Sequence, residues 1–156
     1  MSPRQTLMLA GVVGLLGVAQ DLRASPVVEG LSIGMTPTEG LAKANALASR
    51  FKGKCELKAQ RGIVCQSQDP AQKGFLIEMK FNNGKCTQIE IDYPENSAVA
   101  VEPFNAALGE PRKTKPNRIE WCLDDAWYKV KLYPDRSAKK YHARFEEAGY
   151  CQTKYR

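Results

Sequence analysis

The chain has 156 residues, a formal net charge of +6, five cysteines and one histidine. This length fits a single domain that can bury a core of its own. A single histidine excludes metal sites built on several histidines, and it leaves His142 as the only possible base for a Ser-His-Asp or Cys-His device.

The positive charge is concentrated in the last third of the chain. Residues 27–111 carry 9 Lys and Arg against 10 Asp and Glu, whereas residues 112–156 carry 12 against 6. Such a basic surface attracts an acidic protein face or an anionic envelope component. A solubilising surface is the alternative interpretation. Nucleic acid is not expected as a partner, because the start of the chain, described next, predicts export.

Residues 1–24 are predicted to be a cleaved secretory signal. Arg4 lies in a short polar start, and an apolar run of 13 residues follows from Leu7 to Ala19. A bilayer span needs about 20 apolar residues, so no transmembrane span is expected. Cleavage is predicted after Ala19 or Ala24. No cysteine follows the run, so a lipid anchor is not expected, and the mature protein is predicted to be periplasmic or secreted.

The first predicted helix covers residues 37–52. Thr36 can cap the first turn, Pro37 suits the first helical position, and Glu39 can complete a capping box. Gly53 is expected to end the helix in a left-handed conformation.

Two strands with a turn at residues 60–62 are predicted next. If Leu57 faces Ile63, then Cys55 faces Cys65 on the same side, at a distance that a disulfide spans. The sequence therefore predicts a Cys55–Cys65 disulfide. Two buried, reduced thiols are the alternative.

A second hairpin is predicted around a three-residue turn at residues 82–84. This loop keeps the apolar positions of both strands on one face, namely Phe75, Ile77, Met79, Phe81, Ile89 and Ile91. In that register Cys86 points away from the core. Cys86 is therefore predicted to be the free thiol, and it could link two chains in a homodimer.

The second half of the chain repeats the order of helix and strands. A helix is predicted at residues 99–108, stopped by Gly109, and a hairpin follows in which Asp124-Asp125 form a two-residue turn and Trp121 faces Tyr128. A last strand runs from Tyr141 to Phe145. The second predicted disulfide joins Cys122 to Cys151.

The element order predicts the α+β class, with a single domain at residues 27–156. Two tandem helix-plus-antiparallel-strand units are expected, at about residues 31–93 and 99–151, with both helices packed on one face of the sheet.

Two short segments, residues 33–39 (IGMTPTE) and 107–111 (ALGEP), resemble parts of a known group. The first segment has Gly-Met-Thr at the opening of a helix, and the second has Leu-Gly-x-Pro before strands. Both features resemble the beta-lactamase-inhibitor-protein-like fold, which the small lipoprotein of the outer-membrane assembly machine shares. The resemblance implies a non-catalytic protein that acts by protein contact or in envelope assembly.

The strongest candidate site is the outer face of the last sheet. Aromatic and cationic residues alternate there, and we predict a partner-binding set consisting of Trp127, Lys129, Lys131, Tyr133 and Arg144. A solvated face whose lysines protect a sheet edge is the alternative.

The leading functional hypothesis is a non-catalytic binding protein without metal or cofactor. It would act on an envelope component or on another exported protein. A thiol-dependent dimer or redox protein that uses Cys86 is the second hypothesis. A small secreted hydrolase is the third, with the adjacent acids Asp124-Asp125 or Glu146-Glu147 as its candidate groups.

Overall fold

The computed structural model describes residues 25–59, 61–94, 102–115, 118–123, 128–135 and 140–147. The predicted signal and Cys151 lie outside these residues. The elements in chain order are α1 (Pro37–Ser49), β1 (Gly53–Lys58), β2 (Gly62–Ser67), a 3-10 turn (Pro70–Gln72), β3 (Leu76–Asn82), β4 (Lys85–Asp92), α2 (Glu102–Leu108), β5 (Lys113–Lys115), β6 (Arg118–Leu123), β7 (Tyr128–Asp135) and β8 (Lys140–Glu147).

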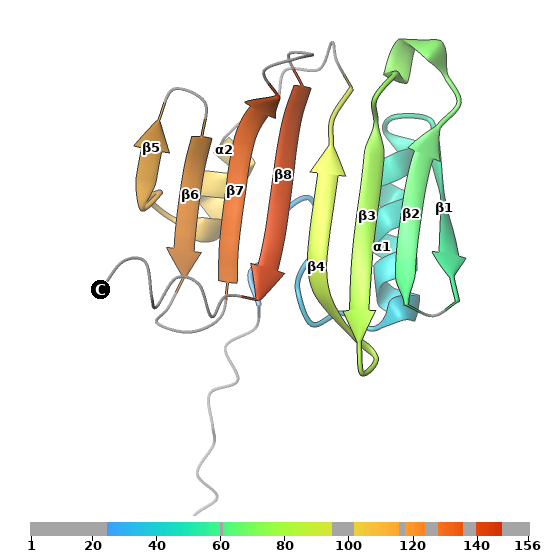
Figure 1. The fold of residues 1–156 in the computed structure, drawn as a ribbon, viewed down its shortest axis with the longest axis horizontal. Coiled ribbons are helices and arrows are strands. Elements are labelled where there is room, and N and C mark those ends of the chain that lie inside the picture. Colours follow the sequence, from blue (N-terminus) through green and yellow to red (C-terminus); the bar gives the residue numbers. More distant parts are fainter. Residues whose placement is uncertain are drawn as a thin grey trace, which may run out of the picture.

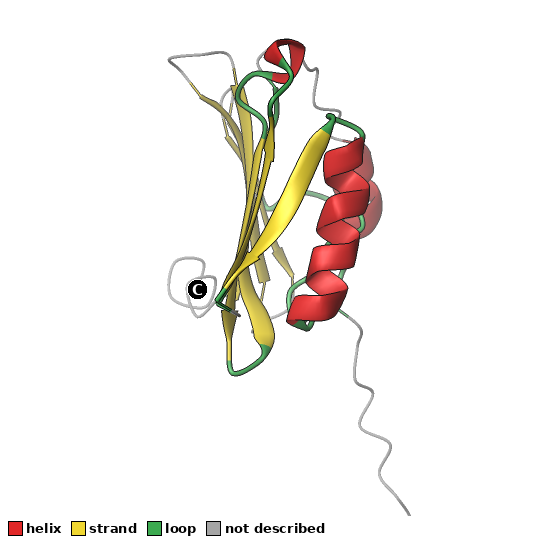
Figure 2. Cartoon of the chain, turned by 90° about the vertical axis from the view of Figure 1, so that its right-hand side faces the viewer, coloured by secondary structure: helices red, strands yellow, loops and turns green. Residues whose placement is uncertain are grey.

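All the described strands belong to one antiparallel sheet with the order β1-β2-β3-β4-β8-β7-β6-β5 (Figure 1). The last strand, β8, therefore inserts beside β4 and joins the two halves of the chain at the centre of the sheet. Both helices lie on the same side of the sheet (Figure 2). The predicted mixed class of helices and antiparallel sheet is confirmed. We call the side without the described helices the outer face.

The two helices are unequal. The main helix, α1, has 13 residues, whereas α2 has 7. The prediction of two tandem units of one kind is therefore not met: one main helix and one short helix accompany the sheet.

Helix α1 begins as the sequence predicts and ends earlier. The backbone N–H of Thr36 donates to Glu39 Oε2 at 2.9 Å, and Thr36 Oγ1 accepts from the Glu39 N–H at 3.3 Å, which closes the capping box. The left-handed residue after the helix is Lys52, with φ of 52°, so the prediction for Gly53 is wrong. Gly53 opens β1 instead, where a Cβ would lie 2.8 Å from Phe75 Cε1.

The core fills the space between the helices and the inner face of the sheet. Under α2, the ring of Phe104 lies 5.8 Å from that of Trp121 and 6.2 Å from that of Phe145. Phe145 pairs with Ile89 of β4, which is fully buried, as is Ile63 of β2. The packing is thus continuous beneath both helices, in keeping with one hydrophobic core.

The β1–β2 hairpin has the predicted register. Leu57 pairs with Ile63 and Cys55 pairs with Cys65, and the Cys55–Cys65 disulfide is confirmed. The edge strand β1 is also tied to α1, because the Cys55 N–H donates to Asn45 Oδ1 at 3.1 Å. This bond occupies one of the backbone donors that an edge strand would offer to another chain.

The β3–β4 hairpin has a different turn from the predicted one. Asn82 pairs with Lys85 across a two-residue turn, in which Asn83 and Gly84 both have positive φ. A β-bulge, which shifts the register between Lys80 and Phe81, then restores the apolar alignment, so Met79 faces Ile89 and Ile77 faces Ile91. The three-residue turn is therefore wrong, although the predicted core face is correct.

The two-residue turn sets Cys86 opposite Phe81, on the core side of the sheet. Its side chain is fully buried and retains its thiol, and Sγ lies 3.5 Å from the Gln88 carbonyl oxygen. Its backbone holds the chain before α1, because the Cys86 N–H donates to the Met35 carbonyl and the Gly34 N–H donates to the Cys86 carbonyl, each at 2.8 Å. The prediction that Cys86 points away from the core is wrong, and the structure gives no support to a dimer linked through it.

We expect the Cys86 thiol to react with a thiol reagent at a rate on the order of a hundredfold lower in the native protein than in denaturant, because access requires local opening. Stopped-flow labelling measures both rates, with Cys86→Ala as the blank. Equal rates in the two conditions would contradict the buried position.

The β6–β7 hairpin is also shifted from its predicted register. Leu123 pairs with Tyr128 and Trp121 pairs with Val130, so four residues connect the strands rather than two. The predicted pairing of Trp121 with Tyr128 is therefore wrong by two positions. A shift of two leaves each residue on its predicted face, because side chains alternate with a period of two.

Candidate functional site

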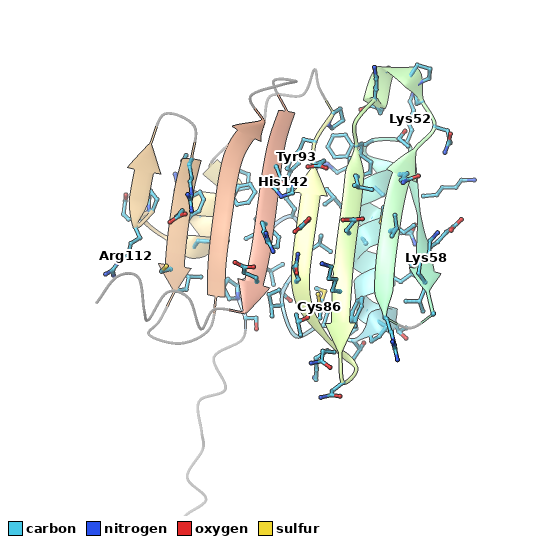
Figure 3. The ribbon with its side chains drawn as sticks, viewed as in Figure 1. Lys52, Lys58, Cys86, Tyr93, Arg112 and His142 are labelled. Carbon is cyan, nitrogen blue, oxygen red and sulfur yellow. A yellow bond between two sulfur atoms is a disulfide. The ribbon has the colours of Figure 1, made fainter. Side chains whose placement is uncertain are left out.

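A continuous set of polar side chains crosses the centre of the outer face. We call it the polar band: Gln88, Glu90, Asp92, His142, Arg144 and Glu146. They occupy alternate positions of β4 and β8, and the register sets Gln88 opposite Glu146, Glu90 opposite Arg144, and Asp92 opposite His142. Their buried neighbours in the chain, such as Ile89 and Phe145, face the core. No described helix covers this face (Figures 1 and 3).

Arg144 lies at the middle of the polar band. Its Nε is 3.3 Å from Glu90 Oε1 and 3.2 Å from Glu146 Oε2. Neither approach has the geometry of a hydrogen bond, so the Nε–H is buried without an acceptor among the described residues, while the side chain as a whole is 37% exposed. Arg144 is thus positioned by the charges of two carboxylates, and its side chain stays partly exposed on the outer face.

His142 and Asp92 form the second contact of the band. His142 Nδ1 lies 2.5 Å from Asp92 Oδ1. The hydrogen bond with Asp92 raises the pKa of His142; burial opposes this, the charges of Asp92 and Glu90 add to it, and Arg144 opposes it. Figure 3 shows His142 between β8 and β4 on the outer face.

The raised pKa of His142 predicts a pH-dependent stability. Above the ordinary histidine pKa of about 6.5, the native state holds a proton that the unfolded state releases, so the free energy of unfolding falls as pH rises through the folded-state pKa. The stabilisation by protonated His142 is fully present below a pH of about 6.5, the ordinary histidine pKa. We expect a loss on the order of 1 kcal/mol, measured by urea unfolding across this window. His142→Gln should remove this slope, and an unchanged slope in the variant would contradict the assignment.

The predicted partner-binding residues fall partly within the described chain. The register pairs Lys129 with Glu146, Lys131 with Arg144, and Tyr133 with His142, which places positions 129, 131 and 133 beside the polar band. Trp127 lies outside the described residues, as do Asp124 and Asp125. The structure thus brings Arg144 together with three of the predicted positions.

Sequence reasoning missed the buried acid at position 120. Glu120 is fully buried and forms an ion pair with Arg118 Nη2. The register places it in one charged row across the sheet, which consists of Glu78, Glu90, Arg144, Lys131 and Glu120. The signal available in the sequence was the cation two residues before Glu120, on the same face of a strand.

Cys122 lies on the same face of β6, paired with Lys129. It is disulfide-bonded, and its partner lies outside the described residues. The Cys122–Cys151 pairing therefore stays a prediction.

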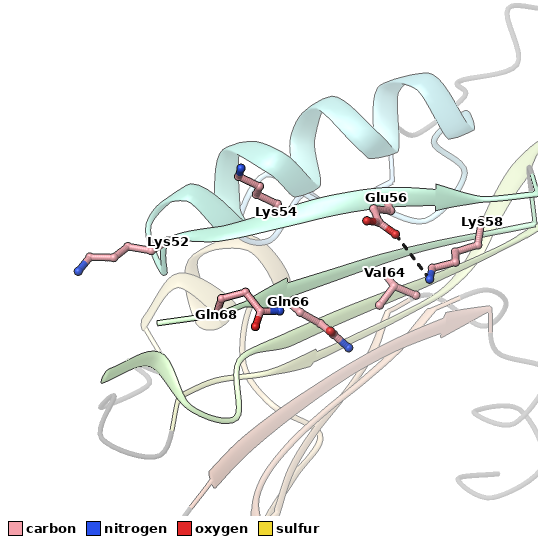
Figure 4. A pocket seen from close by; sticks show the side chains of 7 residues that line it. All are labelled: Lys52, Lys54, Glu56, Lys58, Val64, Gln66 and Gln68. Atoms are coloured by element: carbon pink, nitrogen blue, oxygen red, sulfur yellow. Dashed lines mark ion pairs between the residues drawn. The ribbon is translucent and has the colours of Figure 1, made fainter. Parts of the chain in front are cut away.

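A hollow of about 420 Å³ lies on the outer face at the β1 edge of the sheet, on strands β1 and β2. We call it the lysine hollow: Lys52, Lys54, Glu56, Lys58, Val64, Gln66 and Gln68 line it (Figure 4). Lys52 Nζ lies 2.6 Å from Asp69 Oδ2, and this hydrogen bond raises the pKa of Lys52. Sequence reasoning did not single out these residues, because each lysine by itself is typical of an edge strand.

The described residues contain no group of three side chains suited to a metal ion, and none of their helices is long and apolar enough to cross a membrane. Comparison of the chain with known proteins found no matching family model, no matching curated protein and no matching solved structure.

Proposed function

We propose that this protein is a non-catalytic binding protein that docks another protein through the outer face of its sheet. The observation that carries the proposal is the polar band. It lies at the centre of the sheet, on the face left open by the described helices, and the partly exposed side chain of Arg144 lies there between two carboxylates. Arginines in such partly buried, charge-lined positions are frequent hot spots of protein interfaces.

The charge pattern favours a partner face of mixed sign. In the polar band, His142 lies opposite Asp92 and Arg144 lies opposite Glu90, and Glu146 follows Arg144 on β8. Positions 129 and 131 add lysines beside it, and Tyr133 and Trp127 are the predicted aromatic contacts. Complementary charges fix the register of a docked partner and exclude wrong ones.

We further propose that the protein works in an exported compartment, periplasmic or extracellular. The Cys55–Cys65 disulfide and the disulfide-bonded Cys122 support this, because disulfides persist where conditions are oxidising. The predicted signal at residues 1–24 agrees with it. The resemblance to the inhibitor-protein-like fold implies the same mode of action, by protein contact.

The proposal is tested by measuring how one residue of the band contributes to affinity. The tagged chain would be used to capture a partner from an exported fraction, and the dissociation constant of the purified pair would then be measured. We expect Arg144→Ala to weaken binding about tenfold or more.

Lys43→Ala is the matched control, because Lys43 is an exposed cation on α1, on the opposite side of the sheet. It should bind like the wild type. Wild-type affinity in Arg144→Ala, with its fold verified by circular dichroism, would rule out the band as the docking site.

A further inference from the structure

The lysine hollow is a second charged site on the outer face, separate from the polar band. It is built on β1 and β2, and β3 lies between these strands and β4. Three lysines and one glutamate line it, and Asp69 pairs with Lys52, so the cations of the hollow exceed the anions by one. An excess of positive charge in a hollow raises the local concentration of anionic groups.

The three lysines differ in what they contact. Lys52 is bonded to Asp69, and Lys58 Nζ lies 3.6 Å from Glu56 Oε2, a loose pair in which both side chains are mostly exposed. Lys54 forms no ion pair with any described residue. Lys54 and Lys58 are therefore the cations that a ligand can engage, since an exposed pair such as Lys58–Glu56 contributes little stability of its own.

The spacing of these groups matches an extended chain. Lys54, Glu56 and Lys58 occupy alternate positions of β1, so they share one face of the strand. Successive members lie about 6.7 Å apart, and the two lysines lie about 13 Å apart. Carboxylates at the first and fifth residues of an extended peptide have the same separation, whereas a single small anion cannot reach both lysines.

The hollow also offers groups that suit a peptide. Gln66 pairs with Lys54 across the hairpin, and Gln66 and Gln68 supply amide donors and acceptors. Val64 faces Glu56 and adds an apolar contact. Addition of a strand to the β1 edge is disfavoured, because Asn45 occupies the Cys55 N–H.

We propose that the lysine hollow binds an extended acidic peptide segment, with carboxylates at alternate-face positions that meet Lys54 and Lys58. A basic residue midway between the carboxylates would pair with Glu56. Recognition rests on side chains of the outer face rather than on backbone pairing, and it goes beyond docking through the polar band.

Fluorescence anisotropy at low salt tests the site with a labelled peptide that has Glu-Val-Lys-Val-Glu at its centre. The control peptide has the same composition in the order Glu-Glu-Lys-Val-Val. We expect saturable binding of the first peptide, and binding about tenfold weaker with Lys54→Glu and with Lys58→Glu.

Lys43→Glu is the matched charge reversal, since it makes the same change of net charge on α1, away from the hollow. It should leave peptide binding intact. Equal binding of both peptides, or equal weakening by Lys43→Glu, would overturn the proposal.

A sulfated oligosaccharide serves as the probe for an acidic glycan. If this probe binds in a manner sensitive to Lys54→Glu while the peptide does not bind, the peptide assignment is wrong. Arg144→Ala should not change peptide binding, so failure at the hollow and failure at the polar band are distinguishable.

Discussion

Replacing Trp121 with alanine is expected to lower the free energy of unfolding by about 3–5 kcal/mol. The indole is fully buried, its ring stacks on Phe104, and its Nε1–H donates to the Gly109 carbonyl oxygen at 3.0 Å. The side chain thus joins β6 to α2 and to the glycine that ends this helix. Truncation would leave a cavity and remove the hydrogen bond at the same time.

Urea unfolding followed by far-UV circular dichroism measures the loss. Trp121→Phe is the matched variant, because it keeps a buried ring and removes only the N–H donor and part of the volume, and it should cost less than half as much. A loss smaller than about 1 kcal/mol in Trp121→Ala would contradict the central packing role of the indole.

Removing the Cys55–Cys65 disulfide is expected to cost about 2–3 kcal/mol. The two cysteines are 10 residues apart, so the bridge closes a short loop and limits the freedom of the unfolded chain. It also holds the edge strand β1 onto β2 beneath α1. Alanine is the suitable replacement at both positions, because Cys65 is fully buried and a serine hydroxyl would lose its hydration there.

The comparison is best made in a Cys86→Ala background, which prevents exchange with the buried thiol. In that background, wild-type cysteines at 55 and 65 should give the higher midpoint of urea unfolding. A reductant should lower the urea midpoint of the form with Cys55 and Cys65 more than that of the alanine form, because only the first has this bridge to lose. Equal urea midpoints of the cysteine form and the alanine form without reductant would contradict a stabilising role of the disulfide.

Local sequence signals predicted the elements whose geometry is set by nearby residues. The capping box of Thr36 and Glu39 fixes the start of α1, and the alternation around Cys55 and Cys65 fixes the first hairpin. Glycine after an apolar run marked the end of α2, where Gly109 has φ of 74° and its N–H donates to the Asn105 carbonyl.

The β3–β4 hairpin shows where such reasoning fails. A three-residue turn and a two-residue turn with a bulge place the same apolar residues on the core face, so the hydrophobic pattern cannot choose between them. They differ at Cys86, which lies between the turn and the bulge. The contacts that accompany its burial come from Gly34 and Met35, which are about 50 positions away in the sequence, and no local rule includes them.

The polar band could be predicted only in part, because its contacts also join residues that are distant in the sequence. Strand alternation placed His142 and Arg144 on one face, on a strand next to that of Lys129 and Lys131, but it gave no neighbour on their other side. Their partners, Asp92 and Glu90, come from β4, because β8 inserts at the centre of the sheet. This pairing joins residues about 50 positions apart, and only the strand order reveals it.

Site-specific photo-crosslinking tests the central claim most directly. A photoreactive amino acid would replace Gln88, at the polar band on the outer face, or Lys43, on α1, and each protein would be irradiated with the captured partner. The account predicts crosslinks from position 88 that are lost on adding Arg144→Ala, and none from position 43. Crosslinks from position 43 alone would place the partner on the helical side and contradict docking through the outer face.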